Sequence, residues 1–186
     1  MAQPSPRLKF TYHDYRTTPP GKRYELREGD LVMVPAPSDF HQAISMNLSL
    51  ALGAYIRQRR LGHLRAAPYD VVLSPTDVVQ PDLVFISPQR APFIRPEGCF
   101  GPPDLVVEIL SPSSAEVDRG YKRSLYARHG VREYWLVDPD TRTVEVLTLG
   151  EEGFRLVGLF RQGERLVSPL FPDLTLTVSD VFAEGG

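Results

Sequence analysis

Cysteine is nearly absent from the 186-residue sequence, which contains only Cys99. A single cysteine excludes a disulfide framework and any zinc site built from several thiolates of one chain. This fits a reducing compartment, so we expect a cytoplasmic protein. Without a cysteine partner, Cys99 is interpreted as a small loop residue rather than a nucleophile.

The sequence also lacks an excess of positive charge and any long apolar run. Its 21 Lys and Arg residues are balanced by 23 Asp and Glu residues, and the formal net charge is −2. Because counterion release requires clustered positive charge, binding of nucleic acid or anionic membrane over the whole surface is excluded, and a nucleic-acid role needs a local basic site. No apolar run approaches the roughly 18 residues of a membrane span. Residues Met1 to Arg16 lack the apolar stretch of a secretion signal. We expect one domain over residues 1–186, not exported and without membrane contact.

Lysine and asparagine are scarce. Only Lys9, Lys22 and Lys122 are lysines, the other basic residues are arginines, and Asn47 is the single asparagine beside 18 prolines. Few labile amides and stiffened loops suit a protein from a thermophile, and a biased genome composition would produce the same pattern.

Hydrophobic periodicity and turn residues predict an α/β domain with a mixed sheet and two long helices. In the N-terminal half we expect a short helix at Thr11 to Arg16, a hairpin of Tyr24 to Leu26 and Leu31 to Val34 around Gly29-Asp30, a long helix capped by Ser38 and followed by Gly62, strands at Leu64 to Ala66, Tyr69 to Leu73 and Val78 to Ile86, and a loop at Ser87 to Pro103. After these we expect a buried strand at Leu105 to Leu110, a helix from about Ala115 to His129 with a capping box at Ser113 to Glu116, strands at Tyr134 to Val137, Thr143 to Leu149 and Phe154 to Phe160, and a short strand at Leu174 to Val178.

Glu108 is the sharpest anomaly, because it is a carboxylate inside the apolar run Leu105 to Leu110. An ionised carboxylate buried without a partner costs several kcal/mol, so this position needs a cation, a metal, a proton or a route to solvent. Alternation places Glu108 on the face of Val106 and Leu110. Asp82 has a similar apolar setting, and if the two strands are neighbours the two carboxylates could share one Mg²⁺ or Mn²⁺ ion.

Each candidate also has a purely structural interpretation. Glu108 could pair with an arginine, and Pro81-Asp82 could be a strand irregularity. Lys122 lies at the margin of the second helix's apolar stripe, with Asp118 and Tyr126 four residues away on either side, and is also typical of a solvated lysine.

Three further polar residues are weaker candidates. His41 and Gln42 lie in the first helical turn after Ser38, where an anion is favoured, but a polar helix start is the simpler explanation. Glu25 on a two-faced hairpin is most simply a residue of the wet face.

Several chemistries are set aside because their motifs are missing. The sequence has no G-x-S-x-G elbow, no G-x-x-x-x-G-K-[ST] phosphate loop, no G-x-G-x-x-G fingerprint and no H-E-x-x-H pair.

Several longer motifs, in a fixed order, closely resemble the Uma-two family of the PD-(D/E)XK nuclease superfamily. They are Tyr24-Glu25-Leu26, Pro35-Ala36-Pro37-Ser38 before His41-Gln42, Val79-Gln80-Pro81-Asp82-Leu83, Pro103 to Ser113, Lys122-Arg123 with Tyr126, Glu133 to Pro139, and Ser168-Pro169-Leu170-Phe171-Pro172. The resemblance covers about Tyr24 to Phe182. It implies a restriction-endonuclease-like core, in which a central mixed sheet flanked by helices presents acids to a divalent metal.

The resemblance also implies roles for particular residues. Asp82 and Glu108 correspond to the two metal-binding acids, and Glu25 to an additional acid near the N-terminus. The motif lysine expected two residues after Glu108 would fall at Leu110, so the resemblance nominates Lys122 on the following helix in its place. His41 and Gln42 resemble a further contribution from the helix start.

The implied activity is Mg²⁺- or Mn²⁺-assisted hydrolysis of phosphodiester bonds in DNA, with Asp82, Glu108 and Lys122 as catalytic residues. Tyr126, Arg119 and Arg123 are accessory candidates, and Arg57, Arg59 and Arg60 are further candidates for DNA contact.

Two alternatives to this activity stay open. One is a nuclease-fold binding or assembly protein whose site is residual, and the other is a nuclease for RNA or a branched substrate. A homodimer is expected because cutting two strands commonly uses two sites, but the sequence locates no interface.

Overall fold

The N-terminal part of the computed structural model forms a short helix and a hairpin; the structure describes residues 8–19 and 21–184. Helix α1 spans Tyr12–Tyr15, β1 spans Arg23–Arg27 and β2 spans Asp30–Val34. The hairpin is confirmed, with its turn one residue earlier than expected, because Arg27 pairs with Asp30. Glu28 and Gly29 both have positive φ, at 49° and 79°. This is the twist that suits a two-residue hairpin.

Helix α2 (Asp39–Arg59) begins where the sequence predicts and ends before Gly62. The Oγ atom of Ser38 accepts a hydrogen bond from the main-chain N–H of His41 at 3.2 Å, which confirms the N-cap. Arg60 ends the helix in the left-handed conformation. The described residues contain no helix long and apolar enough to cross a membrane.

The strands form two six-stranded sheets within the described part of the chain. One sheet, called the larger sheet here because most of its strands are longer, has the order β12-β11-β10-β9-β6-β3. Its strands are β3 His63–Ala66, β6 Leu83–Ile86, β9 Leu105–Ile109, β10 Glu133–Asp138, β11 Thr143–Gly150 and β12 Gly153–Arg161. The second sheet is β2-β1-β5-β4-β8-β7, with β4 Val71–Ser74, β5 Asp77–Val79, β7 Ile94–Arg95 and β8 Gly98–Cys99. Strands β9 and β10 run parallel, and the other neighbours in the larger sheet are antiparallel. The mixed-sheet α/β class is therefore confirmed, as two sheets rather than one.

The expected single strand at Val78 to Ile86 is wrong. The chain passes from one sheet to the other at Gln80-Pro81-Asp82, so β5 and β6 belong to different sheets. Pro81 has no N–H for a sheet ladder, which favours a break at this point. The main-chain N–H of Gln80 instead bonds the Glu25 side chain at 3.0 Å, and the carbonyl of Asp82 accepts from Ala67 at 2.9 Å. This crossing point presents Asp82 between the two sheets.

Two other expectations need correction. The predicted loop at Ser87 to Pro103 contains a 3₁₀ helix (Pro88–Phe93) and the short strands β7 and β8. The expected strand at Leu174 to Val178 is replaced by one isolated bridge between Arg165 and Thr177, followed by helix α5 (Val178–Val181). Thr177 caps α5 with its side chain, which favours a helix start over a continued strand.

The second long helix is confirmed, but as three joined segments. They are α3 (Ala115–Val117), a π-helical turn (Asp118–Lys122) and α4 (Arg123–His129). The predicted capping box at its start is wrong, because the Oγ atom of Ser114 accepts from the main-chain N–H of Ser111 instead of capping the helix. Gly130 ends α4 with φ of 82°.

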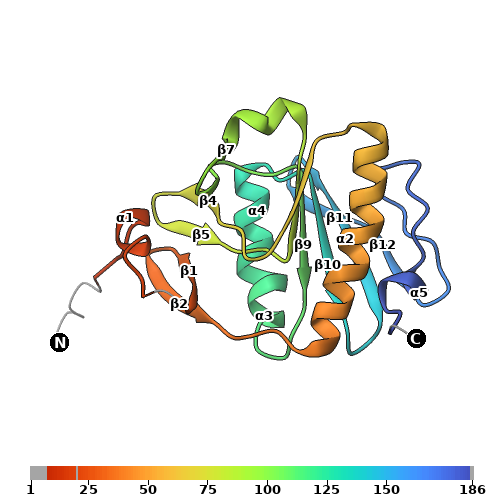
Figure 1. Cartoon of the computed structure of the whole chain (residues 1–186), viewed down its shortest axis with the longest axis horizontal. Helices are drawn as coiled ribbons and strands as arrows, with labels where there is room; N and C mark the ends of the chain where they lie inside the picture. The colour runs from red at the N-terminus through yellow and green to blue at the C-terminus, as the bar shows by residue number, and fades with distance from the viewer. Residues whose placement is uncertain (1–7, 20, 185–186) are drawn as a thin grey trace.

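The larger sheet separates two apolar layers. Helix α2 covers one face and α4 the other, as Figure 1 shows. Leu105, Val107 and Ile109 pack with α2, whereas Val106 and Leu110 pack on the side of α4. The alternation predicted for β9 is therefore confirmed, and Glu108 lies on the α4 side.

Candidate active site

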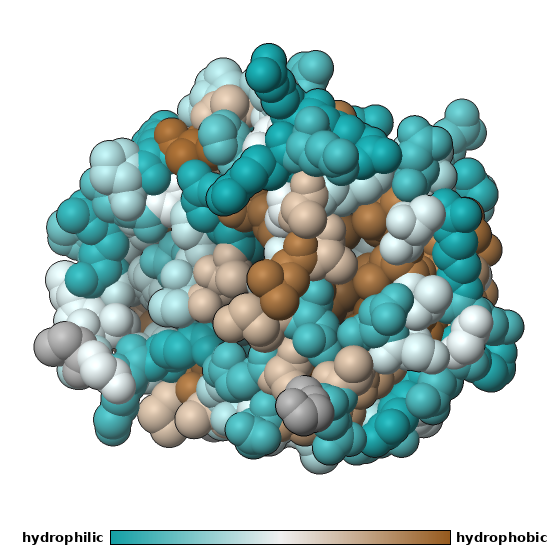
Figure 2. All heavy atoms as spheres, turned by 45° about the vertical axis from the view of Figure 1, so that its right-hand side comes forward, coloured by the Kyte–Doolittle hydropathy of each residue, from teal (hydrophilic) through white to brown (hydrophobic). Residues whose placement is uncertain are grey.

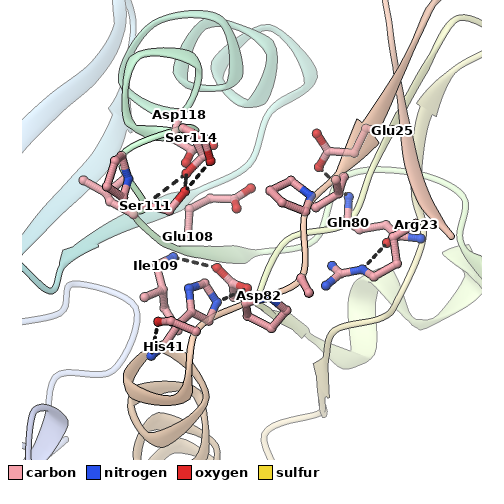
Figure 3. A pocket seen from close by; sticks show the side chains of 18 of the residues that line it. Arg23, Glu25, His41, Gln80, Asp82, Glu108, Ile109, Ser111, Ser114 and Asp118 are labelled. Carbon is pink, nitrogen blue, oxygen red and sulfur yellow. Dashed lines mark hydrogen bonds and ion pairs between the residues drawn. The ribbon is translucent and has the colours of Figure 1, made fainter.

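Glu108 lies on β9, and Asp82 immediately precedes β6, the antiparallel neighbour of β9. Leu83 at the start of β6 pairs with Val107 of β9, so the same register places Asp82 opposite Glu108. Both side chains line a cavity of about 480 Å³ between the hairpin, the start of α2 and the end of β9. Figure 3 shows Asp82, Glu108 and Glu25 directed into this cavity from different elements. The sequence suggested that Asp82 and Glu108 lie close together only if their strands are neighbours, and the fold fulfils this condition.

Hydrogen bonds fix the orientation of Asp82. Its Oδ2 atom accepts the main-chain N–H of Ile109 at 2.7 Å, and its Oδ1 atom lies 2.8 Å from Nε2 of His41. His41 is in the first turn of α2, so the helix cap at Ser38 and the strand β9 position the same carboxylate from two sides. Each carboxylate oxygen therefore has one hydrogen-bond partner, and its remaining lone pair is available to a ligand in the cavity.

Glu108 is held by two side chains of the following helix. Its Oε1 atom accepts from Nζ of Lys122 at 3.0 Å and from the hydroxyl of Tyr126 at 2.6 Å. Glu108, Lys122 and Tyr126 are all buried, at 4%, 4% and 0% exposure. Lys122 is thus a buried partner of the acid and not a solvated helix lysine.

Lys122 is surrounded by carboxylates. Its Nζ atom also lies 3.0 Å from Oε1 of Glu25 and 3.2 Å from Oδ1 of Asp118. The Asp118 contact is an ion pair without hydrogen-bond geometry, and Oδ1 accepts no other hydrogen bond from the described residues. A second cation stabilises Glu25, because Nε and Nη2 of Arg27 both donate to its Oε2 atom. The cluster therefore holds more carboxylates than cations.

A π-turn determines the direction of the lysine. Asp118–Lys122 is the π segment of the helix, and such single turns inside α-helices are frequent at functional sites. Asp118 and Lys122 are four residues apart and both point into the buried cluster. The helix thereby brings Nζ of Lys122 to Glu108 of β9, although the lysine is fourteen residues further along the chain.

The burial of these charges shifts their pKa values in different directions. Burial raises the pKa of Glu108 against the opposing charge of Lys122, and the nearby Asp118, Asp82 and Glu25 raise it further. Burial acts to lower the pKa of Lys122, but the charges of Glu108, Glu25 and Asp118 outweigh it and raise that pKa. Burial acts to raise the pKa of Glu25, but Lys122 and Arg27 lower it to about 2. Lys122 and Glu25 therefore stay charged at neutral pH, whereas burial favours the protonated form of Glu108.

Not all predicted site residues meet in the cavity. Gln42 is exposed on α2 and does not line it. Arg119 pairs with Glu145 and Asp138 on the surface, and Arg123 donates to the carbonyl of Phe154. The accessory roles predicted for these three residues find no support in the geometry of the cavity.

The three arginines at the end of α2 lie away from the cavity as well. None of Arg57, Arg59 and Arg60 lines it, and the guanidinium of Arg59 stacks on the ring of Tyr55 at 4.2 Å.

Two cavity residues of β1 were not predicted from the sequence. Arg23 and Arg27 line the cavity together with Glu25, and Arg23 donates to the Gln80 side chain at 2.9 Å. The signal was available, because residues 23, 25 and 27 alternate with period two and must share one face of a strand. These arginines supply a local positive charge at the cavity, whose position could not be inferred from the net charge of −2.

The donor set suits a hard divalent cation that keeps part of its water shell. Among residues 8–19 and 21–184, no three His, Cys, Asp or Glu side chains form a metal site by themselves. Mg²⁺ commonly binds through one or two carboxylates together with water and substrate phosphate. Asp82 and Glu108 provide two such carboxylates facing one cavity, so the residues present fit the ion. Glu25 as a third ligand stays a prediction, because its oxygens already accept from Lys122, Arg27 and Gln80.

A mixed sheet flanked by helices, with acids on adjacent strands beside a buried lysine, defines the class of restriction-endonuclease-like proteins. Comparison with known families agrees: the profile of the Uma2 family, described as "Putative restriction endonuclease", matches residues 11–179. The chain belongs to the Uma2 family, as its sequence motifs predict.

A solved structure shows the same fold. The chain is similar to a protein from Anabaena variabilis ATCC 29413, described as "a putative nuclease belonging to DUF820", with a TM-score of 0.78 and 22% identity. The alignment covers 93% of this chain and 97% of the Anabaena chain. A search of curated proteins found no match.

Proposed function

We propose that this protein is a metal-dependent endonuclease that hydrolyses phosphodiester bonds in DNA. The observation that carries the proposal is the contact between Lys122 and Glu108, because it supplies the motif cation that Leu110 cannot provide. Family membership and the similar fold of the Anabaena protein support a nuclease-type activity.

Asp82 and Glu108 would hold one Mg²⁺ or Mn²⁺ ion between the two strands. When bound, such an ion polarises the phosphate and lowers the pKa of its bound water. The chain itself contributes the orientation of both acids, through His41 and Ile109 on Asp82 and through Lys122 and Tyr126 on Glu108. The charge of Lys122 also stabilises the negative charge that develops on the phosphate during attack.

Arg23 and Arg27 are the proposed phosphate contacts. Both line the cavity on the side of the hairpin, across from the acids. Nε of Arg23 is the atom bonded to Gln80, which leaves the two terminal nitrogens of its guanidinium for a bidentate phosphate contact. Arg27 is already paired with Glu25, so its first role is to keep that acid charged.

The test is cleavage of supercoiled plasmid DNA by the purified protein with Mg²⁺ or Mn²⁺. We expect nicking by the wild type, and a loss of at least about a hundredfold in Asp82→Asn and Glu108→Gln. Glu116→Gln is the matched control, because Glu116 is exposed and does not line the cavity. Equal cleavage by wild type and both site variants would identify a contaminant and overturn the proposal.

Two further measurements separate the alternative functions. If the protein cleaves single-stranded RNA or branched DNA instead of duplex DNA, the catalytic roles of the two acids stand and the proposed substrate is wrong. Absence of both cleavage and Mn²⁺ binding heat in calorimetry would overturn the enzymatic proposal in favour of a binding or assembly protein.

A further inference from the structure

The outward face of α2 lacks charge over most of its length. From Phe40 to Ile56 the helix contains no Asp, Glu, Lys or Arg, although 24% of the whole sequence is charged. A helix on the surface of a globular protein normally carries charged side chains on the face opposite the core. Met46 and Leu50 are 59% and 65% exposed, while Ile44 and Leu48 occupy the buried face. This helix therefore presents apolar side chains to the outside.

The outward residues follow the spacing of a helix-pairing seam. They are Asp39, Ala43, Met46, Leu50, Gly53 and Arg57. Their separations alternate between four and three residues, which is the 3.5-residue period of helices that pack along their length. None of the six is buried in the protein's own core. The seam has polar ends, small residues next to them and large apolar residues in the middle.

This seam is complementary to itself when reversed. In an antiparallel pair centred at Leu48, Met46 faces Leu50 of the partner subunit, and Ala43 faces Gly53 of the partner subunit. Asp39 then faces Arg57 of the partner subunit, which joins opposite charges. A parallel pair would place each charge beside its like, at an energetic cost. The sequence of the helix thus matches a second copy of this chain in one orientation.

We propose that α2 is the interface of a two-fold symmetric homodimer, in which the two α2 helices pack antiparallel along this seam. An interface of this kind is isologous, because the same patch serves both subunits. Figure 2 shows this side of the molecule, with apolar surface near its centre and hydrophilic side chains above it. The proposal does not depend on the nuclease activity, since none of the six seam residues lines the cavity.

The first test is the mass of the full chain in solution at micromolar concentration, measured by sedimentation equilibrium. We expect a dimer for the wild type and a monomer for Leu50→Glu. The dissociation constant of the dimer should rise at least about a hundredfold in this variant, because two copies of the charge would be buried near the two-fold axis. Leu156→Glu is the matched control, because Leu156 is 54% exposed but lies on β12. Unchanged circular dichroism verifies folding. A monomeric wild type, or a Leu50→Glu protein that stays dimeric, would overturn the proposal.

The second test addresses orientation. Ala43 and Gly53 are ten residues apart, or about 15 Å along one helix, which is too far for a disulfide between identical positions in an antiparallel pair centred at Leu48. We therefore expect a mixture of the Ala43→Cys and Gly53→Cys proteins to cross-link under mild oxidation, and each protein alone to do so much more slowly. Faster cross-linking of each variant with itself would indicate a parallel pair and contradict the interface. Cys99 does not interfere, because it is buried.

Discussion

The Nζ atom of Lys122 lies 3.0 Å from Oε1 of Glu108 and at the same distance from Oε1 of Glu25. The lysine therefore joins the acid of a central strand to the acid of a hairpin that is distant in sequence. It reaches them from a helix, whereas Leu110, two residues after Glu108, packs in the apolar layer. One cation thus serves both the assembly of the fold and the arrangement of the proposed catalytic acids.

Lys122→Met is expected to destabilise the protein by about 3–5 kcal/mol, because it leaves buried carboxylates without their shared cation. Guanidinium unfolding of the variant measures this loss, and cleavage activity is expected to disappear with it. Lys22→Met is the control, because Lys22 is exposed and should change stability by less than about 0.5 kcal/mol. Equal stability of the two variants would mean that the buried cluster does not require the lysine charge.

Tyr126→Phe removes the hydroxyl that donates to Glu108 at 2.6 Å. We expect a loss of about 1–3 kcal/mol in stability, because a buried oxygen of Glu108 loses one of its hydrogen-bond donors. The hydroxyl favours the ionised carboxylate, so its loss raises the pKa of Glu108 further, and any activity that requires ionised Glu108 moves to higher pH. The measurement is the pH dependence of cleavage.

Tyr134→Phe is the comparison for this variant, because its equally buried hydroxyl donates to the main-chain carbonyl of Asp118 and not to Glu108. An identical shift in both variants would argue against a specific effect of Tyr126.

Acid is expected to weaken the fold through Glu25. Its folded-state pKa of about 2 is below the ordinary value of 4.5, so its ionised form stabilises the fold above the ordinary value. This contribution, roughly 3 kcal/mol, is lost as the pH falls from about 5 to 2. Urea unfolding between these pH values measures it, and Glu25→Gln should show a flatter decline in that window. A decline as steep as in the wild type would assign the acid sensitivity to other carboxyls.

Gly120→Ala tests the π-turn. Gly120 is exposed, its φ is not in the left-handed region, and a Cβ atom there would meet nothing within 4 Å. We expect the variant to be more stable by about 0.5–1 kcal/mol, because alanine loses less backbone entropy in a helix. Its melting temperature should rise while cleavage stays unchanged. A marked loss of activity instead would show that the turn requires glycine to aim Lys122.

Much of the element pattern was predictable because it depends on local periodicity. The strand at Leu105 to Ile109 and the face assigned to Glu108 follow from alternation, and the start of α2 follows from the cap at Ser38. The break at Pro81 was considered only as a possible strand irregularity, because the apolar residues on its two sides look like one continuous strand. Membership of two different sheets is a long-range property that such a run does not reveal.

The site divides in the same way. Asp82 and Glu108 stand out in the sequence, because carboxylates in apolar strands need a specific partner. Alternation places Arg23 and Arg27 on the same strand face as Glu25, but only the tertiary structure shows that this face lines the cavity. The cluster around Lys122 likewise depends on a π-turn, which periodicity alone does not predict.

The sequence by itself determined the family, the two acids and the fact that a motif lysine was missing after Glu108. It did so because side-chain types and short spacings are local and visible in the order of residues. Only the tertiary structure decided that Lys122 contacts Glu108, that Glu25 shares this lysine, and that two arginines line the cavity of an acidic protein. Those facts depend on which segments pack together, and packing brings residues 25, 82, 108 and 122 around one cavity.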